Sequence, residues 1–180
     1  MDHAPQTQDD DDARMLEKMR EVFALARSGD AQTLMALLER GLPPNLRNEK
    51  GDSLVMLASY YGHVDVVRAL LARGANPDLR NDAGQTPLAG AAFKGFREVI
   101  EVLLAHGADV EGASPDGRTA LMTAAMFNRT EIVDLLIAHG ANPDARDSRG
   151  MTAADAAAFM GAGGTGARLA GDGVPPPTRH

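Results

Sequence analysis

The chain has 180 residues, of which 44% are hydrophobic and 24% are charged, values typical of a globular domain with a packed core. It contains no cysteine, which excludes disulfides, thiolate metal sites and a cysteine nucleophile. The formal charge is −7, and five of the acidic residues lie within the first twelve positions, so the remaining chain is nearly neutral. A near-neutral body lacks the basic stripe that a nucleic-acid partner requires.

The first thirteen residues carry no signal of membrane targeting. The N-terminus, Met1-Asp2-His3-Ala4-Pro5, has neither the basic nor the apolar segment of a secretory signal. No apolar run approaches the roughly 18 residues of a membrane helix. We therefore expect a cytoplasmic protein with no membrane partner. The run from Asp9 to Asp12 is expected to belong to a flexible acidic arm, residues 1–13, that leads into the first helix; an acidic docking tail is the alternative.

A period of 33 residues dominates the chain from about position 29 onward. Glycine recurs at this spacing in several registers, and leucine recurs in another, which is the signature of a repeat protein built from one supersecondary unit. The ladders are Gly51, Gly84, Gly117 and Gly150; Gly41, Gly74, Gly107 and Gly140; Gly29, Gly62, Gly95, Asn128 and Gly161; and Leu37, Leu70, Leu103 and Leu136.

Each unit predicts two short helices followed by an extended turn. The first helix begins after Ser53, Thr86, Thr119 or Thr152, whose hydroxyl can accept a hydrogen bond from the first helical turn. It ends at the ladder that contains Gly62, where a left-handed cap is tolerated. The second helix has an acid in its first turn, a cation or histidine at its end and one apolar stripe. A Gly-Ala-Asn-Pro-Asp turn follows at 74–78 and again at 140–144.

Residues 82–88 (DAGQTPL), Ala91-Ala92, Gly95 and residues 99–109 (VIEVLLAHGAD) closely resemble an ankyrin repeat. The resemblance implies an all-α ankyrin-repeat α-solenoid of about four and a half repeats. Full copies occupy 48–80, 81–113 and 114–146, a divergent capping repeat occupies 14–47 and a truncated repeat occupies 147–161 within a domain spanning 14–161. Residues 162–180, rich in glycine and proline, are expected to be a disordered tail. The family's usual histidine, which ties neighbouring loops together by hydrogen bonds, is replaced by Met56, Ala89, Met122 and Asp155, so we expect that polar network to be largely missing.

The resemblance also implies where a partner would bind. Family contacts fall at the turn tips and at the two residues before the helix-ending glycine, and five of the chain's seven aromatic residues occupy the latter positions. These side chains could either fill gaps between neighbouring first helices or form an exposed contact ridge. The candidate protein-binding residues are Tyr60, Tyr61, Phe93, Lys94, Met126, Phe127, Phe159 and Met160 before the glycines, and Lys50, Asp52, Gln85, Asp116, Arg118 and Arg149 in the turns.

Motifs for catalysis or for metal and cofactor binding are missing. The histidines have no metal-ligand spacing, and the glycine-rich stretch 161–167 lacks the lysine of a phosphate loop. We predict a non-catalytic, monomeric module, without cofactors or metals, that binds another protein as an adaptor or an inhibitor. The alternative is an assembly subunit that pairs with itself through Ala157 to Met160, because the sequence predicts no second helix in the last repeat.

Overall fold

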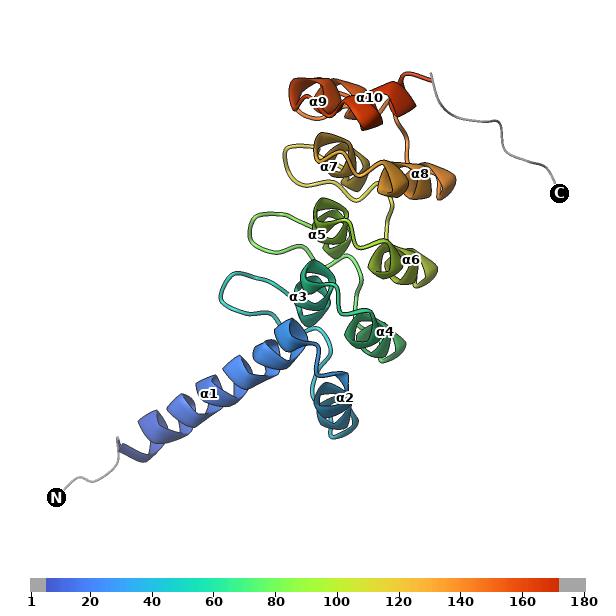
Figure 1. The fold of residues 1–180 in the computed structure, drawn as a ribbon. Coiled ribbons are helices and arrows are strands. Elements are labelled where there is room, and N and C mark those ends of the chain that lie inside the picture. Colours follow the sequence, from blue (N-terminus) through green and yellow to red (C-terminus); the bar gives the residue numbers. More distant parts are fainter. Residues whose placement is uncertain (1–5, 172–180) are drawn as a thin grey trace.

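The computed structural model describes residues 6–171, which form five consecutive helix pairs stacked in a row (Figure 1). This arrangement confirms the predicted all-α solenoid. The pairs are α1 (Gln6–Ser28) with α2 (Ala31–Glu39), α3 (Leu54–Tyr61) with α4 (Val64–Ala72), α5 (Pro87–Lys94) with α6 (Arg97–Ala105), α7 (Ala120–Met126) with α8 (Thr130–Ala138), and α9 (Ala153–Phe159) with α10 (Gly163–Leu169).

The helix boundaries follow the capping chemistry expected from the sequence. Each of the four hydroxyl residues accepts a hydrogen bond from the backbone N–H three positions later, as in the 3.0 Å bond from Met56 N to Ser53 Oγ. The chain then turns with a left-handed residue, at Gly62 with φ 81° and at Asn128 with φ 54°. Local sequence therefore determines where the first helices of repeats two to five begin and where the chain turns after them.

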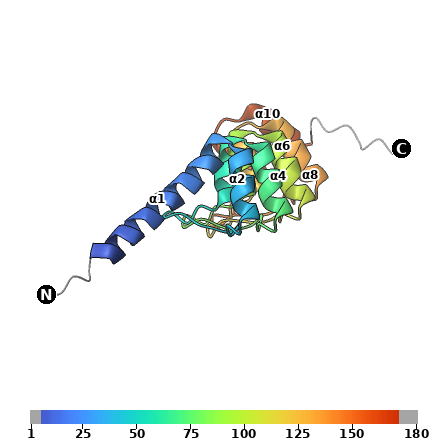
Figure 2. The same ribbon diagram turned by 90° about the horizontal axis from the view of Figure 1, so that it is seen from below.

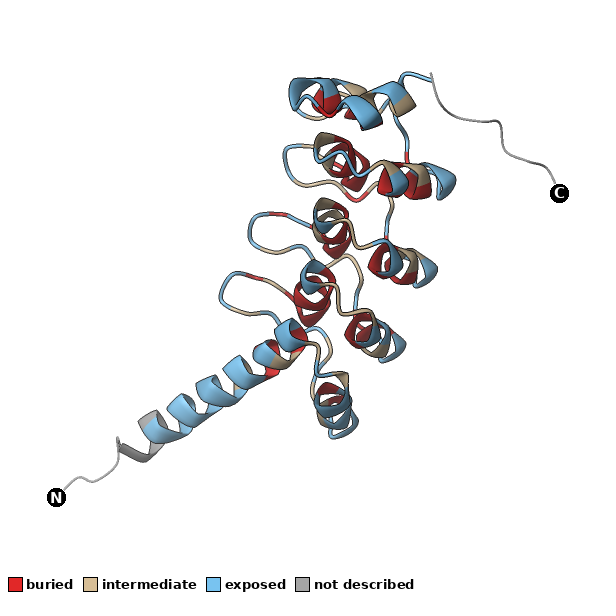
Figure 3. Ribbon diagram, viewed as in Figure 1, coloured by how far each residue is buried: buried red, intermediate tan, exposed pale blue. Residues whose placement is uncertain are grey.

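The helices form two rows. The first helices (α1, α3, α5, α7 and α9) pack against one another in sequence, as do the second helices from α2 to α10 (Figure 2). Buried segments occur in the helices of both rows (Figure 3), and Leu70, Leu103 and Leu136 of the aliphatic ladder are fully buried. Buried residues thus face inward from both rows, and the polar faces of the second helices face solvent.

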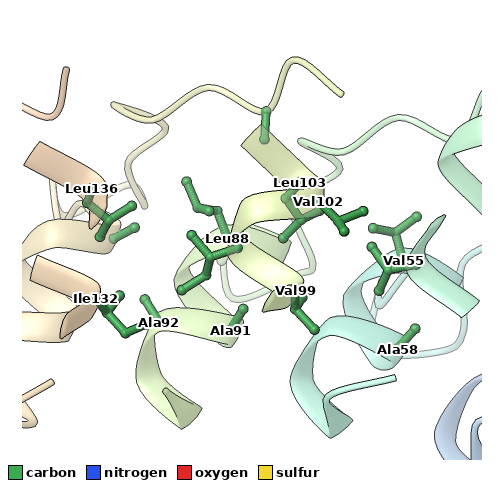
Figure 4. Packing of buried hydrophobic residues seen from close by; sticks show 14 of the residues in the cluster. Val55, Ala58, Leu88, Ala91, Ala92, Val99, Val102, Leu103, Ile132 and Leu136 are labelled. Atoms are coloured by element: carbon green, nitrogen blue, oxygen red, sulfur yellow. The ribbon is translucent and has the colours of Figure 1, made fainter. Parts of the chain in front are cut away.

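Contacts between repeats rest on aliphatic side chains and close-packed alanines (Figure 4). Leu88 and Ala92 of α5, together with Ile132 and Leu136 of α8, belong to one continuous core cluster that runs through all the repeats. Alanines such as Ala91 are completely buried, because a slim first helix allows the neighbouring helix to approach closely. A single pair of helices could not bury these faces alone, so each repeat depends on its neighbours.

The N-terminal end differs from the expected arm. Residues 6–13 are not flexible chain but the first turns of α1, and residues 1–5 lie outside the described part. Val22 and Phe23 are buried against the stack, whereas Met15 and Leu16 are each 61% exposed where the helix extends beyond α3 (Figures 1 and 3). Ion pairs Asp11–Arg14 and Glu17–Arg20, together with negative charge near the helix start, favour this extension.

The C-terminal end also differs from the prediction. The last repeat is not truncated at 161, because α10 supplies its second helix; residues 172–180 of the expected tail lie outside the described part. Glycine occupies three of the seven positions of α10, which disfavours a helix. The helix therefore depends on contacts with the preceding repeat.

Those contacts form a reciprocal cap between α7 and α10. Asn128 Oδ1 accepts a 3.1 Å bond from the N–H of Thr165, a role that the N-cap residue Ala162 cannot perform. In return, the buried hydroxyl of Thr165 donates to the carbonyl of Ala125 at 2.7 Å, near the end of α7. Arg168 pairs with Asp134 on α8, with Nε 2.7 Å from Oδ1. Asparagine rather than glycine at position 128 therefore supplies the acceptor that α10 needs.

Replacing Thr165 with valine should release α10 while leaving the central repeats intact. Valine keeps the shape but removes the hydroxyl. Because the carbonyl of Ala125 keeps its bond from the N–H of Asn128, the cost is that of one hydrogen bond, about 0.5–1.5 kcal/mol. Hydrogen exchange followed by mass spectrometry should show faster exchange at 163–170 and unchanged exchange in α5. Unchanged exchange in α10 would show that the reciprocal cap does not hold this helix.

Asp155 should make the stability of the protein depend on acid. Hydrogen bonds from the backbone N–H and then the hydroxyl of Thr152 lower the pKa of the Asp155 carboxyl below its usual value. The ionised carboxylate is the stabilising form, so its contribution is present above the ordinary pKa and is lost as the pH falls through the lower folded-state pKa.

The measurement is the urea midpoint of the wild type and of Asp155→Asn across about pH 2 to 7. The wild type should have the higher midpoint at pH 7, and this advantage should shrink below about pH 4. Asp144→Asn is the matched control, because the side chain of Asp144 accepts no hydrogen bond within residues 6–171. A constant difference between wild type and Asp155→Asn at every pH would contradict the assignment.

Candidate protein-binding groove

An aromatic strip crosses three successive repeats at the C-terminal ends of the first helices. The rings of Tyr60 and Phe93 stack with centroids 6.2 Å apart, and Phe93 meets Phe127 edge to face at 4.6 Å. Tyr61 contacts Tyr60 at 5.5 Å and His63 at 6.4 Å. The strip arises because residues 33 or 34 positions apart occupy neighbouring places on stacked helices.

Each of these rings is partly packed and partly open. Tyr60, Tyr61 and Phe127 are 38%, 49% and 39% exposed, and Phe93 is half-buried between its neighbours. The strip therefore has features of both sequence-based interpretations: the rings fill space between helices and also present apolar surface to solvent. Lys94 lies over the strip, with Nζ 5.1 Å from the centre of the Tyr60 ring, which is a cation–π distance.

The strip forms one wall of a groove of about 950 Å³, and the turn tips between repeats form the other. The groove lies on the side of the stack from which the loops project in Figure 1. The predicted residues that line it are Lys50, Asp52, Tyr60, Tyr61, Gln85, Phe93, Arg118, Met126 and Phe127.

The remaining predicted residues lie outside this lining. Asp116 pairs with Arg118 at 3.2 Å and Arg149 pairs with Asp147 at 3.2 Å, so both belong to local loop contacts. Phe159, at 74% exposed, and Met160, at 46%, continue the ladder into the fifth repeat beyond the groove. Lys94 lies at the edge of the groove, over Tyr60.

Polar side chains that we did not predict from the sequence hold the loops in shape. Asn48, Asn81, Ser114 and Asp147 stand 33 residues apart at the start of each turn. The Asn48 side-chain oxygen accepts from the N–H groups of Lys50 and Asp52, each at 2.9 Å. Asn81 and Asp147 also accept a backbone N–H of their own turn, whereas the hydroxyl of Ser114 donates to the carbonyl of Arg118. This polar ladder holds each turn from within, and its 33-residue spacing was the available signal.

Neighbouring loops are also tied to one another. Asn81 Nδ2 donates to Asp52 Oδ1 at 2.9 Å, and the N–H of Asp82 donates to the carbonyl of Lys50 at 3.1 Å. Arg47 reaches the carbonyl of Arg80 at 2.7 Å and the carboxylate of Asp82 at 3.5 Å. The loop wall of the groove is thus a linked structure rather than a set of independent turns.

A second acceptor ladder links the turns that follow the second helices. Asn45, Asp78 and Glu111 each accept the N–H of the residue 31 positions later, at 2.8 to 3.0 Å. Burial raises the pKa of Asp78, an effect that the bond from the N–H of Asp109 opposes. By contrast, the hydroxyl of Ser114 lowers the pKa of Asp116, and the N–H of Met151 lowers that of Asp147.

The groove also contains lining residues that were not predicted. Met56, Gly90 and Thr123 form part of its floor, and Arg27 of α1 stands near one end. These residues sit on the inner face of the first helices, so a helical face plot of α5 together with its neighbours could have identified them.

Metal-binding clusters and membrane-spanning helices are both absent from the described part of the chain. Within residues 6–171, no cluster of three or more histidine or acidic side chains is arranged to hold a metal ion. Across the same range, no helix is both long and apolar enough to cross a bilayer.

Comparison with known proteins defines the class of this chain. A profile of three ankyrin repeats matches residues 22–114, and a single ankyrin repeat profile matches residues 116–148. The chain therefore belongs to the ankyrin repeat family, whose repeats are generally protein–protein interaction modules.

One curated relative is an ankyrin repeat protein of Pseudomonas aeruginosa, which is 59% identical over 56 residues. That match covers 31% of this chain and 33% of the relative, so the similarity spans fewer than two 33-residue repeats and about a third of the relative's length.

Replacing Asn81 with alanine should loosen the loop wall of the groove. The change removes the bond to Asp52 and the acceptor for the N–H of Gln85, which should lower the free energy of unfolding by about 1–3 kcal/mol. Urea denaturation would measure the loss, and hydrogen exchange should rise at residues 81–85. If exchange in this loop stayed unchanged, the side-chain ladder would not be what organises it.

Proposed function

We propose that this chain is a non-catalytic protein-interaction module that acts as an adaptor or an inhibitor by binding another protein in its groove. The observation that carries the proposal is the exposed aromatic strip, with Tyr61 and Phe127 open to solvent beside a linked row of loops. Exposed apolar surface of this kind marks interaction sites, and tyrosine is a frequent hot-spot residue.

The rigidity of the groove supports the same proposal. The rings contact one another across repeats, and the loops are joined by hydrogen bonds such as Asn81 to Asp52. A surface that is ordered before binding loses little conformational entropy when a partner arrives. A standard complex would bury on the order of 800 Å² on each side, a surface that several repeats can supply together.

The alternative of self-association through an open last repeat loses its motivation. Helix α10 provides the second helix whose expected absence suggested that alternative, and Ala157 is completely buried. We therefore favour a monomer as the state that meets its partner.

The test is a pull-down from the source organism with the wild type and with Tyr61→Ala/Phe127→Ala. Loss of two partly exposed anchors should weaken partner binding by about 30-fold or more, since truncating a hot-spot residue costs about 2 kcal/mol or more. The fold should lose only about 1 kcal/mol for each ring contact removed, as measured by urea denaturation.

Ile137→Ala is the matched control, because Ile137 is 37% exposed on α8 and does not line the groove. Binding of the captured partner should survive this change. A partner retained equally by the wild type and the double variant would rule out the aromatic strip as its binding surface.

A further inference from the structure

Gly90 lies inside the eight-residue helix α5, where glycine disfavours the helix relative to alanine. Packing does not require a glycine there. A Cβ atom at position 90 would make only ordinary contacts, 3.6 Å from Met56 Sδ and 3.7 Å from Tyr60 Cδ2. At Gly84, by contrast, a Cβ atom would lie 2.1 Å from Pro115, so the turn itself excludes a side chain. The absence of a side chain at position 90 therefore affects the shape of the groove and is not required by the packing of the core.

The space above Gly90 is an apolar recess in the floor of the groove. It lies beside Met56 and Tyr60, with Ala89 preceding it on the same helix and the ring of Phe93 also lining the groove. A bulky apolar side chain from a partner would meet sulfur and aromatic carbon there, which are favourable contacts for such a group.

The charges around this recess are unbalanced once internal pairs are set aside. Asp52 accepts from the amides of Asn48 and Asn81, Asp82 pairs with Arg47, and Arg118 pairs with Asp116. Among residues 10–171, whose side chains the structure describes, the groups in and beside the groove that form no ion pair are the cations Arg27, Lys50 and Lys94 and the carboxylates Glu49 and Asp52, so the cations are in excess by one.

Lys94 follows Gly90 by one helical turn, so its charge and the recess lie on the same face of α5. The excess of unpaired cations favours carboxylates on the occupant. The geometry points to one kind of occupant: a segment of another protein that places a bulky apolar side chain on Gly90 and carboxylates beside Lys94, Lys50 and Arg27. This inference rests on the proposed function, because it specifies what the groove recognises.

The experiment is a selection from a displayed library of random dodecapeptides on the full wild-type chain, with no counter-selection against any variant. Selected peptides should carry Leu, Met, Phe or Trp close to Asp or Glu. A synthetic peptide from the selection should bind the wild type, lose at least 10-fold in affinity to Gly90→Leu, and lose a smaller factor to Lys94→Gln. Its binding should also weaken as salt is added.

Matched controls separate these effects from changes in the fold. Ala36→Leu adds a side chain to the exposed face of α2, and Lys18→Gln removes a cation from the exposed part of α1; neither residue lines the groove. Both should bind the peptide like the wild type. If Gly90→Leu melts early, Gly90→Ala provides a second readout, because it favours the helix yet should still weaken peptide binding.

Each contrary result has a defined meaning. Peptides that lose affinity for Tyr61→Ala or Phe127→Ala but bind Gly90→Leu as well as the wild type would overturn the inference and leave the proposed function standing. Peptides insensitive to all three changes would overturn both. Light scattering that shows self-association abolished by Gly90→Leu would make the occupant a second copy, with Asp10 to Asp12 as its acids, and would overturn the assignment to another protein.

Discussion

Burial of an aliphatic face between neighbouring repeats is the interaction on which the whole structure depends. Leu70, Leu103 and Leu136 are fully buried at equivalent places, and each repeat shares its core with the next. Because one helix pair cannot cover its own apolar face, the chain extends as a row rather than collapsing into a sphere. The stacking of repeats in a row also determines the other features of the structure. It places the loops at regular intervals, aligns the first helices and leaves an apolar face at each end that must be covered.

The groove is a direct consequence of this periodic packing. Side chains that are unremarkable in a single repeat become a continuous strip when stacking brings Tyr60, Phe93 and Phe127 into ring contact. The same stacking lets one loop hold the next, as Asn81 does with Asp52. The groove is therefore assembled from residues distant in sequence, and its rigidity comes from the same contacts that stabilise the fold.

The two ends show how a solenoid closes itself. At the N-terminus, α1 places Val22 and Phe23 on the stack and then continues into solvent with charged residues. At the C-terminus, a glycine-rich segment becomes helical because Asn128 and Asp134 of the preceding repeat hold Thr165 and Arg168. Closure at this end depends on specific polar contacts more than on helix propensity.

Period, helix starts and helix turns could be read from the sequence because each depends on local chemistry. Thr86 caps the start of α5 and Gly95 caps its end, and each cap involves only residues a few positions away. Both therefore play the roles that their residue types predict. The 33-residue spacing also pointed to nine of the fourteen candidate contact residues that line the groove, and their contact with a partner stays a prediction. The tertiary structure alone decided the helix at 163–169, the exclusion of Phe159 from the groove and the recess at Gly90. Each of these depends on partners at least thirty residues away or on the shape of the stack, and no local pattern of residues encodes a contact across that distance.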